Sequence, residues 1–221
     1  MTYLAFLLPL FLLLIPARPA AVTTWTEPWD TIAGVQARWT PVGDVTYTIP
    51  TPGTLDVVAQ SGGLISLQKW DKRQPITVTG TVRAEPNPGS STDAYWGGLT
   101  LYNNNGFDDN YGELATERNV PPWGGDHTPR VVSLTNNIGS ALLVDAGSWV
   151  QHTFEIRWTA PGGGTWKYYV DGNLLQTKQH IGLGNDPNIF ILCVSVGAGV
   201  PDDGSHAHCQ FGPITVVGVQ K

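Results

Sequence analysis

The chain has 221 residues, only 14% of them charged, and a formal net charge of −6 at pH 7. This negative balance argues against a nucleic acid or an anionic membrane surface as the partner. The low charge, together with 26 Gly, 17 Pro and 9 Trp, is typical of extracellular β-rich proteins.

The N-terminus has the layout of a secretory signal peptide. An apolar run from Leu4 to Ile15 is followed by small residues and prolines. The run is too short to cross a bilayer comfortably, so a membrane anchor is not expected in the mature protein. We predict that residues 1–20 contain the signal peptide, with cleavage after Ala17 or after Ala20, and that residues 21–221 form one extracellular domain.

Alternating apolar and polar residues, separated by turn signals, predict about a dozen short β-strands. They fall at residues 45–49, 54–59, 64–69, 76–84, 94–103, 111–118, 130–135, 149–158, 166–170, 189–196 and 211–219. Asp171-Gly172 is a strong hairpin signal. Helical periodicity is weak, and no helix is predicted in residues 23–39. The pattern predicts an all-β sandwich or jelly roll of two packed antiparallel sheets.

The strand at 111–118 carries two of the five glutamates in the chain, Glu113 and Glu117. In a strand these two side chains and Ala115 point to one face. Glycosidases need such a pair, one carboxylate to attack or activate and one to donate a proton. Two plainer interpretations stay open, a solvated strand face and a short helical turn, because Glu, Leu, Ala and Arg favour helix.

Aromatic residues near this strand are candidates for sugar contacts. Trp96 and Tyr102 share one face of the strand at 94–103, which a hairpin joins to the carboxylate strand. Such a face suits the stacking of sugar rings, although the same residues could pack in a core. Trp123 and His127 lie in the following loop and are further candidates for substrate binding.

Cys193 and Cys209 are the two cysteines of the chain. An even number in a secreted protein predicts a disulfide between them.

No metal site or cofactor is predicted. His206 and His208 would share a strand face, but the sequence places no third ligand beside them. A structural calcium ion bound by loop oxygens is common in sandwich folds, yet no ligand loop is recognisable in this chain.

From about Thr54 onward, the order of segments resembles the concanavalin A-like sandwich, in particular family sixteen of the glycoside hydrolases. That family carries a strand with the pattern Glu, apolar, Asp, apolar, Glu, and Glu113 and Glu117 match both glutamates. The later motifs match residues 154–158, the Trp-Lys-Tyr-Tyr-Val-Asp-Gly hairpin at 166–172, and residues 191–197.

The resemblance implies a retaining hydrolase of β-linked polysaccharide, of the β-glucan or galactan type, with Glu113 as nucleophile and Glu117 as general acid/base. We expect a monomer that acts on a polysaccharide or oligosaccharide. Two residues depart from the family: Ala115 replaces the central Asp, and Cys193 stands where the family often has Asn. The loss of the Asp should weaken the tuning of both glutamates.

Two alternatives remain. The Tyr-Val-Asp-Gly hairpin also occurs in lectins and laminin G-like modules, so the chain could be a non-catalytic carbohydrate-binding domain. A polysaccharide lyase would need a Tyr or His base beside a charge-neutralising residue, and no such cluster stands out.

Overall fold

A computed structural model describes residues 20–85, 95–103, 111–118, 130–135, 138–143, 150–159, 164–179, 189–198 and 206–221. The predicted signal peptide lies almost wholly outside these residues and stays a prediction.

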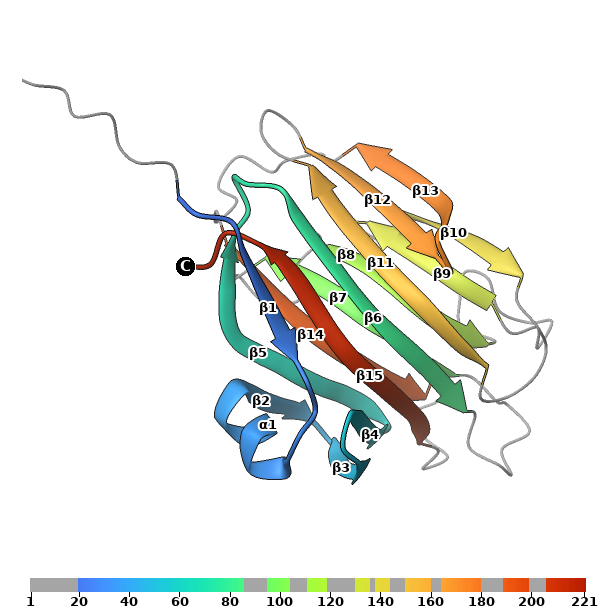
Figure 1. Ribbon diagram of the computed structural model, residues 1–221. Helices are drawn as coiled ribbons and strands as arrows, with labels where there is room; N and C mark the ends of the chain where they lie inside the picture. Colours follow the sequence, from blue (N-terminus) through green and yellow to red (C-terminus); the bar gives the residue numbers. More distant parts are fainter. Residues whose placement is uncertain are drawn as a thin grey trace, which may run out of the picture.

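The described strands form two antiparallel sheets that pack face to face (Figure 1). Sheet A contains β1 (Thr23–Glu27), β3 (Thr46–Thr51), β4 (Thr54–Ala59), β6 (Ile76–Glu85), β11 (Gln151–Thr159), β12 (Thr165–Val170), β13 (Asn173–Gln179) and β15 (Ala207–Gly218). Sheet B contains β2 (Trp39–Gly43), β5 (Ser61–Asp71), β7 (Tyr95–Asn103), β8 (Tyr111–Arg118), β9 (Arg130–Thr135), β10 (Ile138–Leu143) and β14 (Ile189–Ala198).

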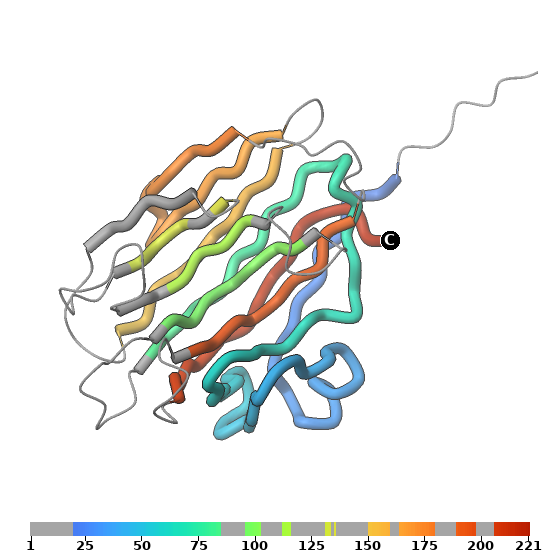
Figure 2. The backbone as a smooth tube through the Cα atoms, turned by 180° about the vertical axis from the view of Figure 1, so that it is seen from behind, coloured from blue at the N-terminus to red at the C-terminus, as the bar shows by residue number. Residues whose placement is uncertain are grey.

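The strand order of sheet A is β13-β12-β11-β6-β15-β4-β3, with β1 also paired to β15, and that of sheet B is β10-β9-β8-β7-β14-β5-β2. Figure 2 shows sheet B on the near side of the molecule. The predicted all-β jelly-roll sandwich is confirmed.

Most predicted strands are present, and the differences have local causes. The Asp-Gly turn is confirmed, with positive φ at both Asp171 and Gly172. The strand after it, β13, was missed because it is an edge strand whose largely exposed side chains show no apolar alternation.

A short helix was also missed. Helix α1 (Ile32–Arg38) has seven residues and a single buried one, Val35, so its sequence carries no helical periodicity. The Thr31 hydroxyl caps it by accepting a hydrogen bond from the Gly34 N–H at 3.0 Å. Among the described residues, no helix is long and apolar enough to cross a bilayer.

An aromatic cluster fills the core between the sheets. The ring centroids of Trp158 and Trp166 are 4.9 Å apart, and Phe190 of sheet B lies 5.2 Å from Trp166. A Cβ atom on Gly112 would approach the Trp166 ring to 2.5 Å, so the backbone of β8 lies directly against this ring. Because the inner face of sheet B is committed to this core, the alternate residues of each strand face outward.

The N-terminal strand is fixed by one buried carboxylate. Glu27 has no exposed surface and accepts two hydrogen bonds from Arg38, at 2.7 and 2.8 Å, and one from Trp39 Nε1 at 2.7 Å. These contacts join β1 of sheet A to α1 and to β2 of sheet B.

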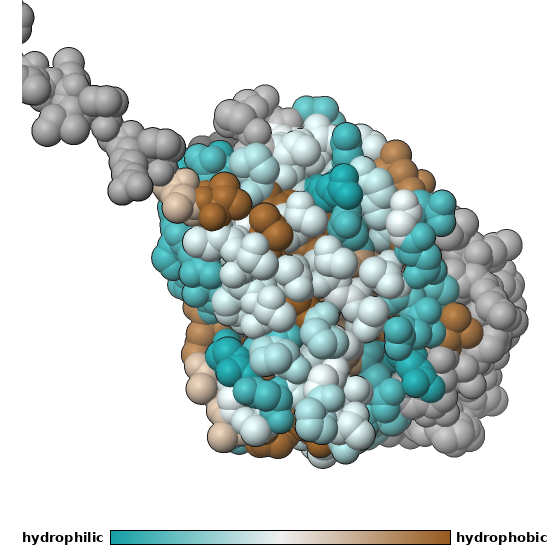
Figure 3. Space-filling view, viewed as in Figure 1, coloured by the Kyte–Doolittle hydropathy of each residue, from teal (hydrophilic) through white to brown (hydrophobic). Residues whose placement is uncertain are grey.

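The outer face of sheet A presents mainly neutral polar side chains, many of them threonine (Figure 3).

Both cysteines are free, so the predicted disulfide is wrong. Cys209 belongs to the core, where a Cβ atom on Gly97 of sheet B would come within 2.0 Å of its Sγ. Cys193 pairs with Thr100 and lies on the other face of sheet B. A sheet therefore separates the two thiols, which the even number of cysteines could not reveal. Burial raises the pKa of both thiols, so the reactive thiolate is suppressed.

Thiol titration tests this arrangement. We expect the unfolded, unreduced protein to react at both cysteines with a disulfide reagent such as dithionitrobenzoate. The native protein should react much more slowly, because both thiols are buried and protonated. An unfolded protein without reactive thiols would show that the disulfide forms after all.

Candidate functional site

The outer face of sheet B carries the predicted carboxylate and aromatic residues. Here "outer face" means the surface turned away from sheet A. Core residues such as Leu99, Leu114 and Val194 occupy the opposite positions of the same strands. The outer face therefore presents the alternate residues Trp96, Gly98, Thr100 and Tyr102 of β7, Glu113 and Ala115 of β8, and Cys193, Ser195 and Gly197 of β14.

A pocket of about 340 Å³ opens on this face above β2, β5, β7 and β14. Its lining consists of Val42, Gly43, Ser61, Gly62, Gly63, Trp96, Tyr102, Cys193, Ser195 and Val196. The structure thus brings Trp96 and Tyr102, two residues chosen from the sequence, to one pocket. They are six positions apart on β7, roughly 20 Å along a strand, so the pocket follows the strand direction.

Glycines create the room in this pocket. A Cβ atom on Gly197 would come within 2.0 Å of the Trp96 ring, so the indole lies directly on the β14 backbone. A Cβ atom on Gly63 would meet the Val194 carbonyl oxygen at 2.1 Å. The lining side chains are aromatic, aliphatic, hydroxyl or thiol, and none of those described carries a formal charge at neutral pH. Such a surface suits an uncharged ligand with both apolar faces and hydroxyl groups.

Glu113 lies beside the pocket and is itself buried, with 8% of its surface exposed. Its Oε1 atom is 3.4 Å from the Ser195 hydroxyl oxygen, which in turn lies 3.4 Å from Thr100 Oγ1. Burial raises the pKa of Glu113 from 4.5 to about 7, and the hydrogen bond from Ser195 opposes this rise only in part. Glu113 therefore keeps its proton to a higher pH than an exposed glutamate does.

The partner carboxylate is placed by its backbone alone. The register of β8 sets Glu117 opposite Trp96, and Glu113 opposite Thr100, so the two glutamates occupy the same face of the strand. The strand interpretation is thus confirmed over the helical one, but the Glu117 side chain lies outside the described part. Trp123 and His127 lie outside the described residues altogether, and their roles stay predictions.

Ala115 occupies the position between the two glutamates. It is 1% exposed, and an added Cβ on the neighbouring Gly98 would lie 2.8 Å from the Ala115 Cβ. A methyl group thus stands where the resembling family has a carboxylate. Without that second carboxylate, the raised pKa of Glu113 comes from desolvation.

Two hydroxyl residues of this site were not predicted as site residues. Thr100 has no exposed surface, and Ser195 is 9% exposed. Strand alternation could have found them, because Thr100 shares a face with Trp96, and Ser195 shares one with Cys193. The sequence carries no sign that β14 and β7 are neighbours, because 92 residues lie between Thr100 and Cys193 in the chain.

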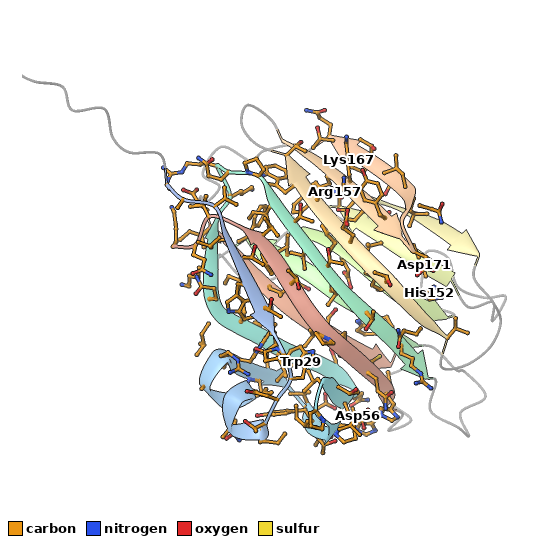
Figure 4. The ribbon with its side chains drawn as sticks, in the orientation of Figure 1. Trp29, Asp56, His152, Arg157, Lys167 and Asp171 are labelled. Carbon is orange, nitrogen blue, oxygen red and sulfur yellow. The ribbon has the colours of Figure 1, made fainter. Side chains whose placement is uncertain are left out.

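Two other polar pairs among the described residues connect neighbouring strands. Asp171 accepts hydrogen bonds from the Thr153 N–H and contacts His152 Nδ1, both at 2.8 Å, and so holds the β12–β13 turn against β11 (Figure 4). His208 bonds Asp56 across β15 and β4. In the described part of the chain, no group of three or more His, Cys, Asp or Glu residues could hold a metal ion.

No model of a known protein family matches the sequence, and no curated protein shows significant sequence similarity to it. Solved structures do match the fold. A Bacillus licheniformis β-glucanase is 15% identical with a TM-score of 0.56, covering 87% of this chain and 97% of its own.

Two further matches widen the comparison. A winged bean acidic lectin, solved with methyl-α-D-galactose, is 9% identical with a TM-score of 0.64, covering 91% of this chain and all (100%) of its own. A Mycobacterium tuberculosis protein described as an immunostimulatory antigen and pseudo β-1,3-glucanase is 13% identical with a TM-score of 0.53. The match covers 88% of this chain and 98% of that protein's chain.

The chain therefore has the concanavalin A-like fold that these β-glucanases and the lectin share. At these identities the comparisons establish the fold, which enzymes and lectins share.

The burial of Glu113 predicts a pH-dependent stability. Because its folded-state pKa is raised, ionisation opposes folding; this penalty is absent below about pH 4.5 and complete above about pH 7. The difference corresponds to about 3 kcal/mol. Glu113→Gln lacks the penalty, so it should gain stability relative to the wild type between pH 5 and pH 8. Urea unfolding at the two pH values measures this, and a constant difference would show that Glu113 is solvated.

Proposed function

We propose that this protein binds a polysaccharide or oligosaccharide in the pocket on the outer face of sheet B. The observation that carries the proposal is the pairing of Trp96 with Tyr102 along one uncharged pocket that is also lined by Ser61 and Ser195. Aromatic rings stack on the apolar faces of sugars, while hydroxyl groups exchange hydrogen bonds with sugar hydroxyls. Neutral, β-linked glucans or galactans are the ligands that best fit this chemistry.

Hydrolysis of that ligand is the second candidate function. It is supported by Glu113 and Glu117, which occupy one face of β8 beside the pocket. In a retaining mechanism, Glu113 attacks as a carboxylate and Glu117 donates the proton.

Two observations favour binding without cleavage. Glu113 is not among the described residues that line the pocket, and its raised pKa leaves much of it protonated at neutral pH. A protonated carboxyl group cannot act as the nucleophile. The proposal includes secretion through the N-terminal signal peptide, because polysaccharides of this kind are extracellular. It also includes action as a monomer.

Substitution of the pocket aromatics tests binding. Trp96→Ala and Tyr102→Ala should each weaken binding of a β-glucan oligosaccharide by about tenfold, because each removes one stacking surface. Tyr169→Ala is the matched control, since Tyr169 stacks under Arg157 on the outer face of sheet A, away from the pocket. Isothermal titration calorimetry measures the affinities, and thermal unfolding checks the fold. Unchanged binding in both pocket variants would exclude this pocket as the site.

Turnover decides between the binding protein and the hydrolase. For a hydrolase, reducing ends should appear from β-glucans or galactans, and Glu113→Gln should abolish them while preserving binding. The rate should be low at pH 5 and rise toward pH 7, because only ionised Glu113 attacks, and it should fall again at the pH at which Glu117 loses the proton that it must donate. Ala115→Asp restores the carboxylate of the resembling family and should raise the activity. Absence of cleavage over a broad polysaccharide panel, in the wild type and in Ala115→Asp, would leave the binding function alone.

A further inference from the structure

Ser195 lines the pocket, and its hydroxyl group also lies within hydrogen-bonding reach of Glu113. Its hydroxyl oxygen has three polar atoms within reach. Glu113 Oε1 and Thr100 Oγ1 each lie 3.4 Å away, and the Gly98 carbonyl oxygen lies 3.5 Å away. These distances are long for hydrogen bonds between oxygens, so small rotations of the side chain decide which contact is made.

The contact spans three strands and depends on a glycine. Ser195 of β14 pairs with Gly98 of β7, and Gly98 pairs with Ala115 of β8. A Cβ atom on Gly98 would lie 2.1 Å from the Leu114 carbonyl oxygen, so this position accepts no side chain. The Glu113 carboxyl group can therefore reach diagonally over Gly98 to a hydroxyl two strands away.

Among the described residues, the Ser195 hydroxyl group is the hydrogen-bond donor to the Glu113 carboxyl group. Thr100 pairs with Glu113 from β7 and Leu134 pairs with it from β9. Cys193 of β14 lies beyond Thr100, and Ala115 is the next outward-facing residue of β8.

The Cys193 thiol is the described titratable group on this face that interacts with Glu113, whose charge helps to raise the pKa of the thiol. By register, Tyr111 and Glu117 of β8 and Arg130 of β9 occupy the same face, with side chains outside the described part. None of the described outer-face side chains of β7, β8 and β14 is positively charged.

A serine hydroxyl has one proton and two acceptor lone pairs. It can therefore serve both protonation states of the carboxyl group. When Glu113 is ionised, Ser195 donates its proton to Oε1. When Glu113 is protonated, the carboxyl O–H donates to Ser195 Oγ, and the serine proton turns to the Gly98 carbonyl oxygen.

We propose that Ser195 is a positioning residue for Glu113, which holds the carboxyl group over Gly98 and replaces the hydrogen-bond partner that Ala115 cannot provide. This inference deepens the proposed function, because Ser195 connects the ligand pocket to the carboxyl group. The role of the contact in ligand binding therefore rests on the proposed function. Its geometry can nevertheless be tested without any ligand.

The experiment is a carbon-13 NMR titration of the Glu113 carboxyl group, whose signal is assigned by its loss in Glu113→Gln. Ser195→Ala removes the hydrogen bond from both forms, but the bond to the ionised carboxylate is the stronger one, so the midpoint should rise by about 0.5 to 1 pH unit. Ser195→Thr keeps the hydroxyl and should restore the midpoint to within about 0.2 pH unit of the wild type. The matched control is Ser133→Ala, which removes a buried hydroxyl that bonds Gln176 on the inner side of sheet B.

An unchanged midpoint in Ser195→Ala, or an equal rise in Ser133→Ala, would overturn the proposal. Should Ser195→Ala fail to fold, the wild type still gives an answer. The Ser195 Cβ shift should titrate with the same midpoint as Glu113 and become independent of pH in Glu113→Gln; a Cβ shift that does not titrate would overturn the proposal.

Calorimetry with a β-glucan oligosaccharide separates the two claims. A midpoint shift without sugar binding would leave the Ser195 contact intact and reject the proposed function. Sugar binding without a midpoint shift would support the proposed function and reject the Ser195 contact.

Discussion

The burial of one face of sheet B against sheet A is the constraint on which the candidate site depends. Trp166 lies against the backbone of Gly112, and Cys209 lies against that of Gly97, so β8 and β7 cannot turn their inner faces outward. Since side chains alternate along a strand, this packing fixes Glu113, Trp96 and Ser195 on the outer face. A register slip of one residue would bury those polar groups in the core, at a cost that the fold could not sustain.

The electrostatic character of the site follows from what this constraint leaves beside Glu113. A buried carboxyl group is stabilised in its charged form by cations or hydrogen-bond donors. Here the described neighbours are a methyl group, a thiol and two hydroxyls, at Ala115, Cys193, Thr100 and Ser195. Desolvation therefore outweighs the single contact from Ser195, and the pKa of Glu113 rises to about 7. The same uncharged environment that suits a neutral sugar lowers the fraction of Glu113 that is present as the nucleophilic carboxylate.

The sequence predicted those features that depend on local pattern. Period-two alternation placed β4, β7, β8 and β9 within a residue of their observed bounds, and Asp171-Gly172 identified a hairpin by its backbone preference. Alternation also assigned Trp96 and Tyr102 to one face, and Glu113 to the same face as position 117. It missed the short helix α1 and the strands β1, β2, β10 and β13.

The sequence by itself thus determined the fold class, the strands and the faces on which the carboxylate and aromatic residues lie, because these follow from chirality, pleat and the burial of apolar side chains. The tertiary structure alone decided which residues from distant strands meet. It separated Cys193 from Cys209 by a sheet, and it brought Ser195 to Glu113 over Gly98. It also set the protonation of Glu113, because desolvation and hydrogen bonding depend on neighbours in space, and the one-dimensional pattern carries no record of them.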